Sequence, residues 1–516
     1  MRSLDPETWP DERRTRCCTV ARARRALAPD VHRVLVAQNA GLAASPARDA
    51  HLAALGGGAA AVVTGQQVGL FLGPLYTIYK AASAVVLARA LAAETGAPVV
   101  PVFWLQTEDH DLAEIAEIGV PGATACETIR AAIDAGNRIS IAHCTLPPGI
   151  TGCLAQLADA LGDRRAGHAH VERLGRHYRP GTAWATAFAG VLAELFAPEG
   201  LVMIDPRDPT LAALAAPIHA RALALAAPIA AAMIERGREL ARAGAAAPVH
   251  VRPGAPLSFF HPDGPRGPRV RLDPAPGGDG FVEVGSGRIH TREALIAMLG
   301  AEPLRFSTSA LLRPIVQDTL LPTAAYVGGP AELAYFAQLA PVYRAFGKPP
   351  PLAVPRARFR IADHRTHQLL VRLGLTAADV ERPEAELLAR LRPQGAAGPE
   401  LARRLLAPFA ASHDELAASL AGAGPDIARA LARTRGTVER AVGKLAGKLE
   451  RAGLYADAAR VDAVRRLRAL LAPDGAAQER RLGLAGLAAR IGDRNVVERV
   501  LAAIDPFDPT LQDLVA

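Results

Sequence analysis

The segment that most constrains the fold spans residues 62–80 and reads VVTGQQVGLFLGPLYTIYK. It overlaps a short apolar run, 59–64, that predicts a buried strand ending at a glycine. Pro74 stands where a helix could begin, because proline at the first helical position gives up only an N–H without an intrahelical partner. The segment therefore predicts a strand, a glycine turn and a helix over 75–94.

This glycine turn could be structural or could bind a ligand. Gly73 would let a ligand approach the backbone, and the N–H groups at the start of the helix would favour an anion. Tyr76 and Lys80 share a helical face that leans toward the turn. The glycine spacing matches neither the dinucleotide fingerprint nor the P-loop, and the residues alone leave both readings open. The candidate binding residues are Thr64, Gly65, Gln66, Gln67, Gly73, Tyr76 and Lys80.

Further apolar runs alternate with helical stretches along the first 360 residues. Strands are predicted at 99–105, 201–204, 323–327 and 352–354, and a second helix from Leu112 onward. Strands that alternate with helices predict an α/β fold with a parallel sheet covered on both faces. Gly/Pro-rich stretches near 121–180 and 243–289 are predicted to be insertions, the second of them a β-rich or loop segment.

An acidic cluster follows the strand predicted at 99–105. Glu108, Asp109 and His110 stand just past its carboxyl end, where open parallel sheets bind ligands. His110 could take a proton from a nucleophilic amine, and the carboxylates could hold an ammonium group or Mg²⁺. These three are the candidate catalytic residues. Asp111 fits a helix cap better than a catalytic role, because Glu114 follows it at capping-box spacing. A zinc site here is a weaker alternative, and no metal ligand is assigned.

A second turn resembles the first. A strand ends at Gly328-Gly329, Pro330 follows, and Glu332 stands in the next helical turn, where negative charge also stabilises a helix by itself. Arg356 follows another strand and could bind a carboxylate or phosphate through two hydrogen bonds. The candidate binding residues of this region are Arg313, Gln317, Gly328, Gly329, Glu332, Tyr335 and Arg356.

Beyond residue 360 the chain reads as long Ala/Leu/Arg helices. Alternating spacings of four and three predict a heptad seam and an antiparallel helical hairpin or coiled coil. Its apolar positions include Ile427, Leu431, Val438, Leu445 and Leu449. The predicted domains are an N-terminal helical segment (1–50), a catalytic core (51–360), a coiled-coil arm (361–475) and a C-terminal segment that packs back on the core (476–516).

Composition narrows the possible partners. Half of the 516 residues are hydrophobic and 21% are charged, which is typical of a globular protein. The net charge of +8 is dispersed, so no nucleic-acid partner is predicted. The N-terminus lacks the apolar run of a signal peptide, and glycines and Pro74 interrupt the longest uncharged stretch. We expect a cytoplasmic protein without a membrane span and with free cysteines.

These blocks together resemble one family, the bacillithiol biosynthesis cysteine-adding enzymes, or cysteine ligases (BshC family). The matching blocks, in order, are VVTGQQVGLFLGPLYTIYK, PVFWLQTEDHDLAEI, LLRPIVQDTLLP, YVGGPAELAYFAQL, QERRLGL and AIDPFDP. The resemblance implies a Rossmann-like core with connecting insertions and a coiled-coil arm that forms a homodimer. It also implies the last step of bacillithiol biosynthesis, in which cysteine is added to the amine of glucosaminyl-malate.

Amide formation from a free carboxylate is uphill in water, so ATP or another nucleotide is expected to activate cysteine, with Mg²⁺ as an additional possibility. In this hypothesis Lys80 or Arg313 offsets anionic charge, His110 or a neighbouring acid deprotonates the amine, and Arg356 binds the malate carboxylates. Two alternatives stay open. One is a ligase for another amine acceptor on the same scaffold, and the other is a coiled-coil scaffold or nucleic-acid-binding protein.

Overall fold

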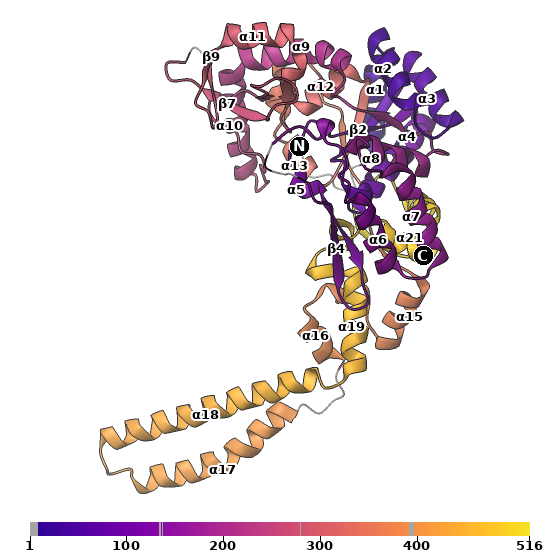
Figure 1. The fold of residues 1–516 in the computed structure, drawn as a ribbon. Helices are drawn as coiled ribbons and strands as arrows, with labels where there is room; N and C mark the ends of the chain where they lie inside the picture. The colour runs from indigo at the N-terminus through magenta and orange to yellow at the C-terminus, as the bar shows by residue number, and fades with distance from the viewer. Residues whose placement is uncertain (1–8, 134–135, 137, 279, 392–396) are drawn as a thin grey trace. The chain divides into compact units, whose positions relative to one another are not determined.

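The computed structural model describes residues 9–133, 136, 138–278, 280–391 and 397–516 (Figure 1). The chain divides into two compact units. The first comprises residues 1–120, 127–363 and 478–516, and the second comprises 121–126 and 364–477. The domain boundaries given above stay a prediction.

A five-stranded parallel sheet forms the centre of the first unit, in the order β12-β11-β1-β2-β5. Its strands are β1 (Ala60–Gln66), β2 (Val99–Leu105), β5 (Val202–Ile204), β11 (Thr323–Gly328) and β12 (Leu352–Pro355). Thr64 of β1 lies opposite both Val327 and Phe103, so the carboxyl ends of three adjacent strands meet at one edge. The predicted α/β fold with a parallel sheet is confirmed.

Helices cover both faces of this sheet. Ala61 and Val63 of β1 belong to one apolar cluster, whereas Ala60 and Val62 belong to another on the opposite face. A strand buried on both faces is usually apolar on both, which explains the run of alanines and valines from Ala60 to Val63 in β1. The first cluster includes α2 (Pro29–Ala40), α3 (Pro46–Gly56), α9 (Pro209–Ala224) and α12 (Arg313–Leu320), and the second includes α1 (Trp9–Ala23) and α4 (Tyr76–Thr95).

A second, antiparallel sheet is inserted between β5 and β11, in the order β10-β6-β7-β8-β9. The predicted β-rich character of this region is confirmed. Its strands are β6 (Ser258–Phe260), β7 (Val270–Pro274), β8 (Gly280–Glu283), β9 (Ile289–Thr291) and β10 (Phe306–Thr308). The helices around it include α10 (Ala226–Arg242) and α11 (Arg292–Ala301).

The helix predicted from Leu112 onward is only one turn long. Asp111 caps it by accepting a hydrogen bond from the Glu114 amide at 3.2 Å, as its spacing predicted. The chain then enters β3, whose Ile118 and Val120 favour strand over helix. The elements here are α5 (Leu112–Ile115), β3 (Glu117–Pro121), β4 (Cys126–Arg130), α6 (Ile150–Leu161), α7 (Arg165–His177) and α8 (Trp184–Leu195).

The C-terminal residues 478–516 belong to the first unit. Here β14 pairs in parallel with β13. The remaining elements of this unit are α13 (Pro330–Phe336), α14 (Ala340–Ala345), β13 (Arg358–Ala362), α20 (Gln478–Arg481), α21 (Ala485–Ile491), α22 (Asp493–Ala503) and β14 (Leu511–Val515).

The second unit is helical, and α17 packs against α18 as an antiparallel hairpin (Figure 1). The Arg435 guanidinium joins the hairpin by an ion pair with Asp414 at 2.9 Å. Ile427, Leu445 and Leu449, on the predicted heptad seam, are 41–45% exposed, so the hairpin itself does not cover them. The helices are α15 (His364–Leu373), α16 (Glu384–Arg390), α17 (Ala397–Ser419), α18 (Pro425–Leu454) and α19 (Ala458–Leu471).

Among the described residues, no single helix has the length and apolar character needed to cross a membrane. The bent pair α9 and α10 meets that test of length and composition only when its two helices are taken together.

Candidate active site

A polar cleft of about 270 Å³ lies at the carboxyl edge of the parallel sheet. It gathers side chains from segments far apart in the sequence, including the ends of β1, β2, β11 and β12. The predicted residues that line it are Gln66, Gln67, Tyr76, Lys80, Asp109, Arg313, Gly329, Glu332, Tyr335 and Arg356. Gln106, Glu114 and Arg480, which had no predicted ligand role, line it as well.

Lys80 holds one wall of the cleft. Its ammonium group donates to the Gly65 carbonyl at 2.8 Å and to Gln66 Oε1 at 2.9 Å, and it forms an ion pair with Glu332. These contacts use all three of its donors. Lys80 therefore connects β1 to α13. None of its N–H groups is left free to contact an anionic ligand, which is the role predicted from the sequence.

Glu332 completes this wall. It accepts hydrogen bonds from the Tyr326 hydroxyl at 2.6 Å and from the Gly329 amide at 2.8 Å, besides its ion pair with Lys80. Burial alone would raise the pKa of Glu332, but the Lys80 charge and these hydrogen bonds lower it overall. The carboxylate is therefore ionised and bonded within the protein.

Two predicted arginines also have partners inside the protein. Arg313 donates to Gln317 Oε1 at 2.8 Å and to the Tyr335 hydroxyl at 2.7 Å. Arg356 forms a bidentate pair with Glu479, at 2.7 and 2.9 Å, and both side chains are almost fully buried. A guanidinium engaged in this way is not available to a malate carboxylate, so the role predicted for Arg356 differs from its observed contacts.

The glycine turn is bonded to the protein rather than open to an anion. Phe71, Leu72 and Gly73 have positive φ angles of 50°, 75° and 66°. The amides of Gly73, Leu75 and Thr77 donate to backbone carbonyls, that of Leu75 to the Leu482 carbonyl at 2.8 Å. A Cβ on Gly69 would approach the Cα of Gly73 to 2.8 Å, so this glycine provides contact within the turn. Helix α4 begins at Tyr76, two residues after Pro74.

Of the acidic cluster, only Asp109 reaches the cleft. One amide group, Gln67 Nε2, donates to Asp109 at 2.8 Å and to Glu114 at 3.0 Å. Burial would raise the pKa of Asp109, but hydrogen bonds from the His110 backbone amide and from Gln67, together with the charge of Arg269, hold it well below its usual value. Asp109 and Glu114 thus form a fixed pair of carboxylates at the cleft.

Glu108 and His110 turn away from the cleft toward the antiparallel insertion. Glu108 accepts from the hydroxyl and the amide of Thr308, and burial raises its pKa. His110 Nδ1 accepts a hydrogen bond from Arg269 at 3.1 Å. Because a guanidinium only donates, the other ring nitrogen of a neutral His110 carries the proton. This geometry does not present His110 as a base to the cleft.

The other predicted residues outside the cleft have structural contacts. The Thr64 hydroxyl donates to the Val327 carbonyl at 2.9 Å and joins β1 to β11. Gln317 is fully buried and donates to Asp318 at 3.0 Å. Gly65 accepts from Lys80, Gly328 ends β11, and Gly73 lies on a neighbouring pocket described below.

Sequence reasoning missed Arg480 and Arg269. Arg480 lies in the QERRLGL block, which the sequence marks only through its resemblance to the family. Arg269 lies in the insertion, 160 residues from Asp109, and its Nη1 donates to that carboxylate at 3.2 Å. No local pattern marks Arg269, because its partners come from another part of the chain.

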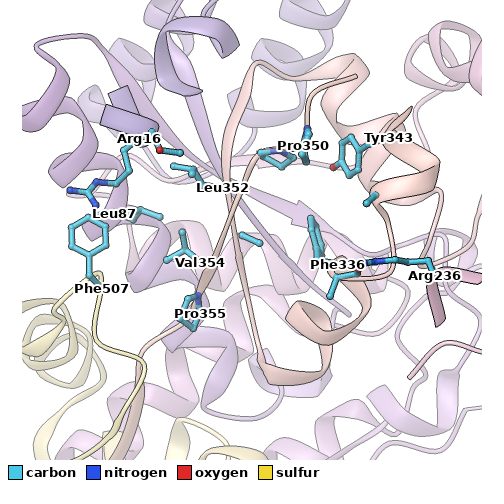
Figure 2. A pocket seen from close by; sticks show the side chains of 15 residues that line it. Arg16, Leu87, Arg236, Phe336, Tyr343, Pro350, Leu352, Val354, Pro355 and Phe507 are labelled. Atoms are coloured by element: carbon cyan, nitrogen blue, oxygen red, sulfur yellow. The ribbon is translucent and has the colours of Figure 1, made fainter. Parts of the chain in front are cut away.

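A larger cavity of this unit, about 460 Å³, lies elsewhere (Figure 2). Prolines, aromatic rings and aliphatic side chains form it along the edge strand β12, with Arg16 on one side and Arg236 on the other (Figure 2). Arg16 is paired with Glu94 and stacks on Phe507, and Arg236 is paired with Glu239. The cavity lining has no carboxylate, histidine or lysine to move a proton, so the smaller polar cleft is the candidate active site.

The described residues contain no group of three or more His, Cys, Asp or Glu side chains that could hold a metal ion. The cleft can hold an ammonium or amine group at Asp109 and Glu114 and can bind an anion at Arg480. Its tyrosines stay neutral at physiological pH, because burial raises the pKa of both Tyr76 and Tyr335.

The fold and cleft define a Rossmann-like α/β protein whose polar site lies at the carboxyl edge of its sheet. Residues 9–357 match the family described as "Bacillithiol biosynthesis BshC, N-terminal Rossmann-like domain". Because this match covers more than half of the chain, the chain belongs to the BshC family.

Several relatives carry the name "Putative cysteine ligase BshC". One from Koribacter versatilis is 41% identical over 365 residues, covering 70% of this chain and 66% of the relative. One from Salinibacter ruber is 40% identical over 326 residues, covering 62% and 57%. One from Solibacter usitatus is 36% identical over 338 residues, covering 65% and 61%. The matches thus span about two thirds or less of these relatives' lengths.

Proposed function

We propose that this protein is a ligase that joins the carboxyl group of cysteine to the amine of glucosaminyl-malate, the last step of bacillithiol biosynthesis. Membership of the BshC family and the names of the relatives support the reaction class. The observation that carries the proposal is the cleft, where two paired carboxylates of the family-matched domain and the free guanidinium of Arg480, from the C-terminal segment, lie at the sheet edge. Fold alone would not select this activity.

In this proposal Asp109 and Glu114 orient the attacking amine. Their carboxylates are held by a shared Gln67 amide, so the amine would meet a preformed acceptor pair. Glu114 is exposed and lacks an ion-pair partner among the described residues. We therefore assign it, rather than His110, as the group that takes the amine proton.

A nucleotide is proposed as the source of energy for the amide bond. Lys80, Arg313 and Arg356 already have partners, so the free cationic donors lining the cleft do not suffice for a triphosphate. Mg²⁺, if required, would be held mainly by phosphate oxygens, since no metal-binding group of three side chains is found among the described residues.

The test is incubation of the purified chain with cysteine, glucosaminyl-malate and ATP, followed by mass detection of the product. The proposal predicts that bacillithiol forms in proportion to the AMP or ADP released. Release of AMP would show that ATP is cleaved between its α- and β-phosphates, and release of ADP that it is cleaved between its β- and γ-phosphates. Product that forms only with another amine acceptor would replace the substrate assignment. Absence of any cysteine amide would reject the ligase.

We also propose that the arm, α17 and α18, forms a homodimer. Its exposed apolar seam, including Ile427 and Leu449, supports the proposal. Light scattering of the full chain should give twice the monomer mass, and Ile427→Glu/Leu449→Glu should give the monomer. A monomeric wild-type chain at micromolar concentration would contradict this proposal.

A further inference from the structure

A second pocket of about 250 Å³ adjoins the cleft. The two spaces share part of their lining, namely Gln66, Gln67, Tyr76, Glu114 and Arg480. Gly69 and Gly73 of the glycine turn form one side of the second pocket, and β3 forms another. Cleft and pocket are therefore two parts of one site, separated by the side chains that they share.

The C-terminal segment that supplies Arg480 is firmly held on both sides. Gln478 Oε1 accepts from the Ile361 amide at 2.8 Å, and Gln478 Nε2 donates to the Ile361 carbonyl at 2.9 Å. After Arg480, the Leu482 carbonyl accepts from Leu75, and the Gly483 amide donates to the Gly119 carbonyl at 3.0 Å. The backbone of Arg480 is thus fixed at the boundary between the two spaces before any ligand arrives.

Glu479, the residue before Arg480, neutralises other arginines. It forms the buried bidentate pair with Arg356 and a further ion pair with Arg358 at 3.3 Å. Arg480 itself is exposed and has neither an ion pair nor a hydrogen bond among the described residues. Of the arginines that line the cleft, Arg313, Arg356 and Arg480, it is the one whose guanidinium is free for a ligand.

The opposite charge lies across the same boundary. Glu114 lines both spaces with Arg480, and the Tyr76 hydroxyl experiences both charges, since Glu114 raises its pKa and Arg480 lowers it. Arg481 adds a second guanidinium to the pocket and donates to Thr128. A molecule with an amine at one end and a carboxylate at the other matches this distribution of charge.

We infer that Arg480 binds a carboxylate of the amine substrate in the pocket beside the glycine turn, and so selects acceptors that carry both an amine and an acid group. The inference rests on the proposed function and makes it more specific. It transfers the carboxylate-binding role from Arg356, which is already paired with Glu479, to the neighbouring free arginine. An arginine suits this task because its planar fork fits a carboxylate with two hydrogen bonds.

The experiment compares two acceptors in the full-length chain, glucosaminyl-malate and the uncharged methyl glucosaminide, with wild type, Arg480→Gln and Arg480→Lys. Arg480→Gln should raise KM for glucosaminyl-malate about tenfold to hundredfold, the range for loss of a charged hydrogen bond, with kcat little changed. KM for cysteine and for methyl glucosaminide should stay the same. KM of Arg480→Lys for glucosaminyl-malate should lie between those of wild type and Arg480→Gln, because lysine keeps the positive charge but lacks the two-pronged guanidinium.

The matched control is Arg89→Gln, because Arg89 is exposed on α4 and lines neither space. It should leave every constant at the wild-type value. An equal rise of KM for both acceptors, or no rise for either, would overturn the inference.

Calorimetric titration with L-malate separates this inference from the ligase proposal. If wild type forms no cysteine amide but binds malate, and Arg480→Gln weakens that binding at least tenfold, the subsite stands and the ligase assignment fails. If malate binds wild type and Arg480→Gln equally, or binds neither, the subsite fails whatever the catalytic activity.

Discussion

The polar cleft and the apolar cavity along β12, both in the first unit, differ in the interactions that hold their lining residues in place. The cleft is lined by charged groups that are bonded within the protein, such as Lys80 to Glu332 and Arg356 to the buried Glu479. The larger cavity along β12 is lined by apolar side chains such as Leu87 and Val354, which are held by burial. Cavity size is therefore not the basis on which we select the candidate active site. The selection rests on the hydrogen-bond donors and acceptors that line each cavity.

The largest expected loss of stability comes from breaking the Lys80–Glu332 ion pair in the cleft wall. Lys80→Met should lower the free energy of unfolding by about 3–5 kcal/mol, because it leaves the Glu332 carboxylate buried without its cation. Urea unfolding followed by the fluorescence of Trp104 and Trp184, both buried in this unit, measures it. The double variant Lys80→Met/Glu332→Gln should recover part of the loss. Additive losses would show that the two side chains are not coupled.

A smaller loss of stability is expected from truncating a side chain that lines the apolar cavity. Leu87→Ala should cost about 2–3 kcal/mol, since it removes buried methyl groups beside a space that already exists. Catalytic constants should not change. A loss of activity at unchanged protein concentration would show that the apolar cavity takes part in the reaction. It would contradict the assignment of the reaction to the polar cleft alone.

The smallest effect is a difference in pH dependence between the two walls. The pKa of Glu332 is lower in the folded chain than its unfolded value, so its stabilisation is present at neutral pH and is lost as pH falls through the folded pKa. The stability difference between wild type and Lys80→Met/Glu332→Gln should therefore shrink below about pH 4. The Leu87→Ala difference should stay constant with pH. If the stability differences of both variants changed with pH in the same way, Lys80 and Glu332 would not form an ionised pair in the folded chain.

The sheet could be predicted from the sequence because the burial of each strand is visible in its own run of apolar residues. The run at 59–63 is apolar at every position, as is typical of a strand covered on both faces. The partners of Lys80 and Arg356 could not be predicted, because Glu479 is 123 residues from Arg356 and pairing depends on the finished fold. The glycine pattern correctly predicted a turn, but it could not show that the Leu75 and Leu72 amides donate to Leu482 and Tyr178, which are far away in the sequence.

The most direct test of the central claim, that the polar cleft is the reaction site, blocks each cavity in turn. Ala331 is exposed on the cleft wall, and Ala340 is half-buried on the wall of the apolar cavity. The rate of cysteine–amide formation is measured by mass spectrometry for Ala331→Trp and Ala340→Trp, with melting temperatures as the control for folding. The account predicts at least a tenfold loss for Ala331→Trp and near-normal turnover for Ala340→Trp. The reverse result in two folded variants would contradict it.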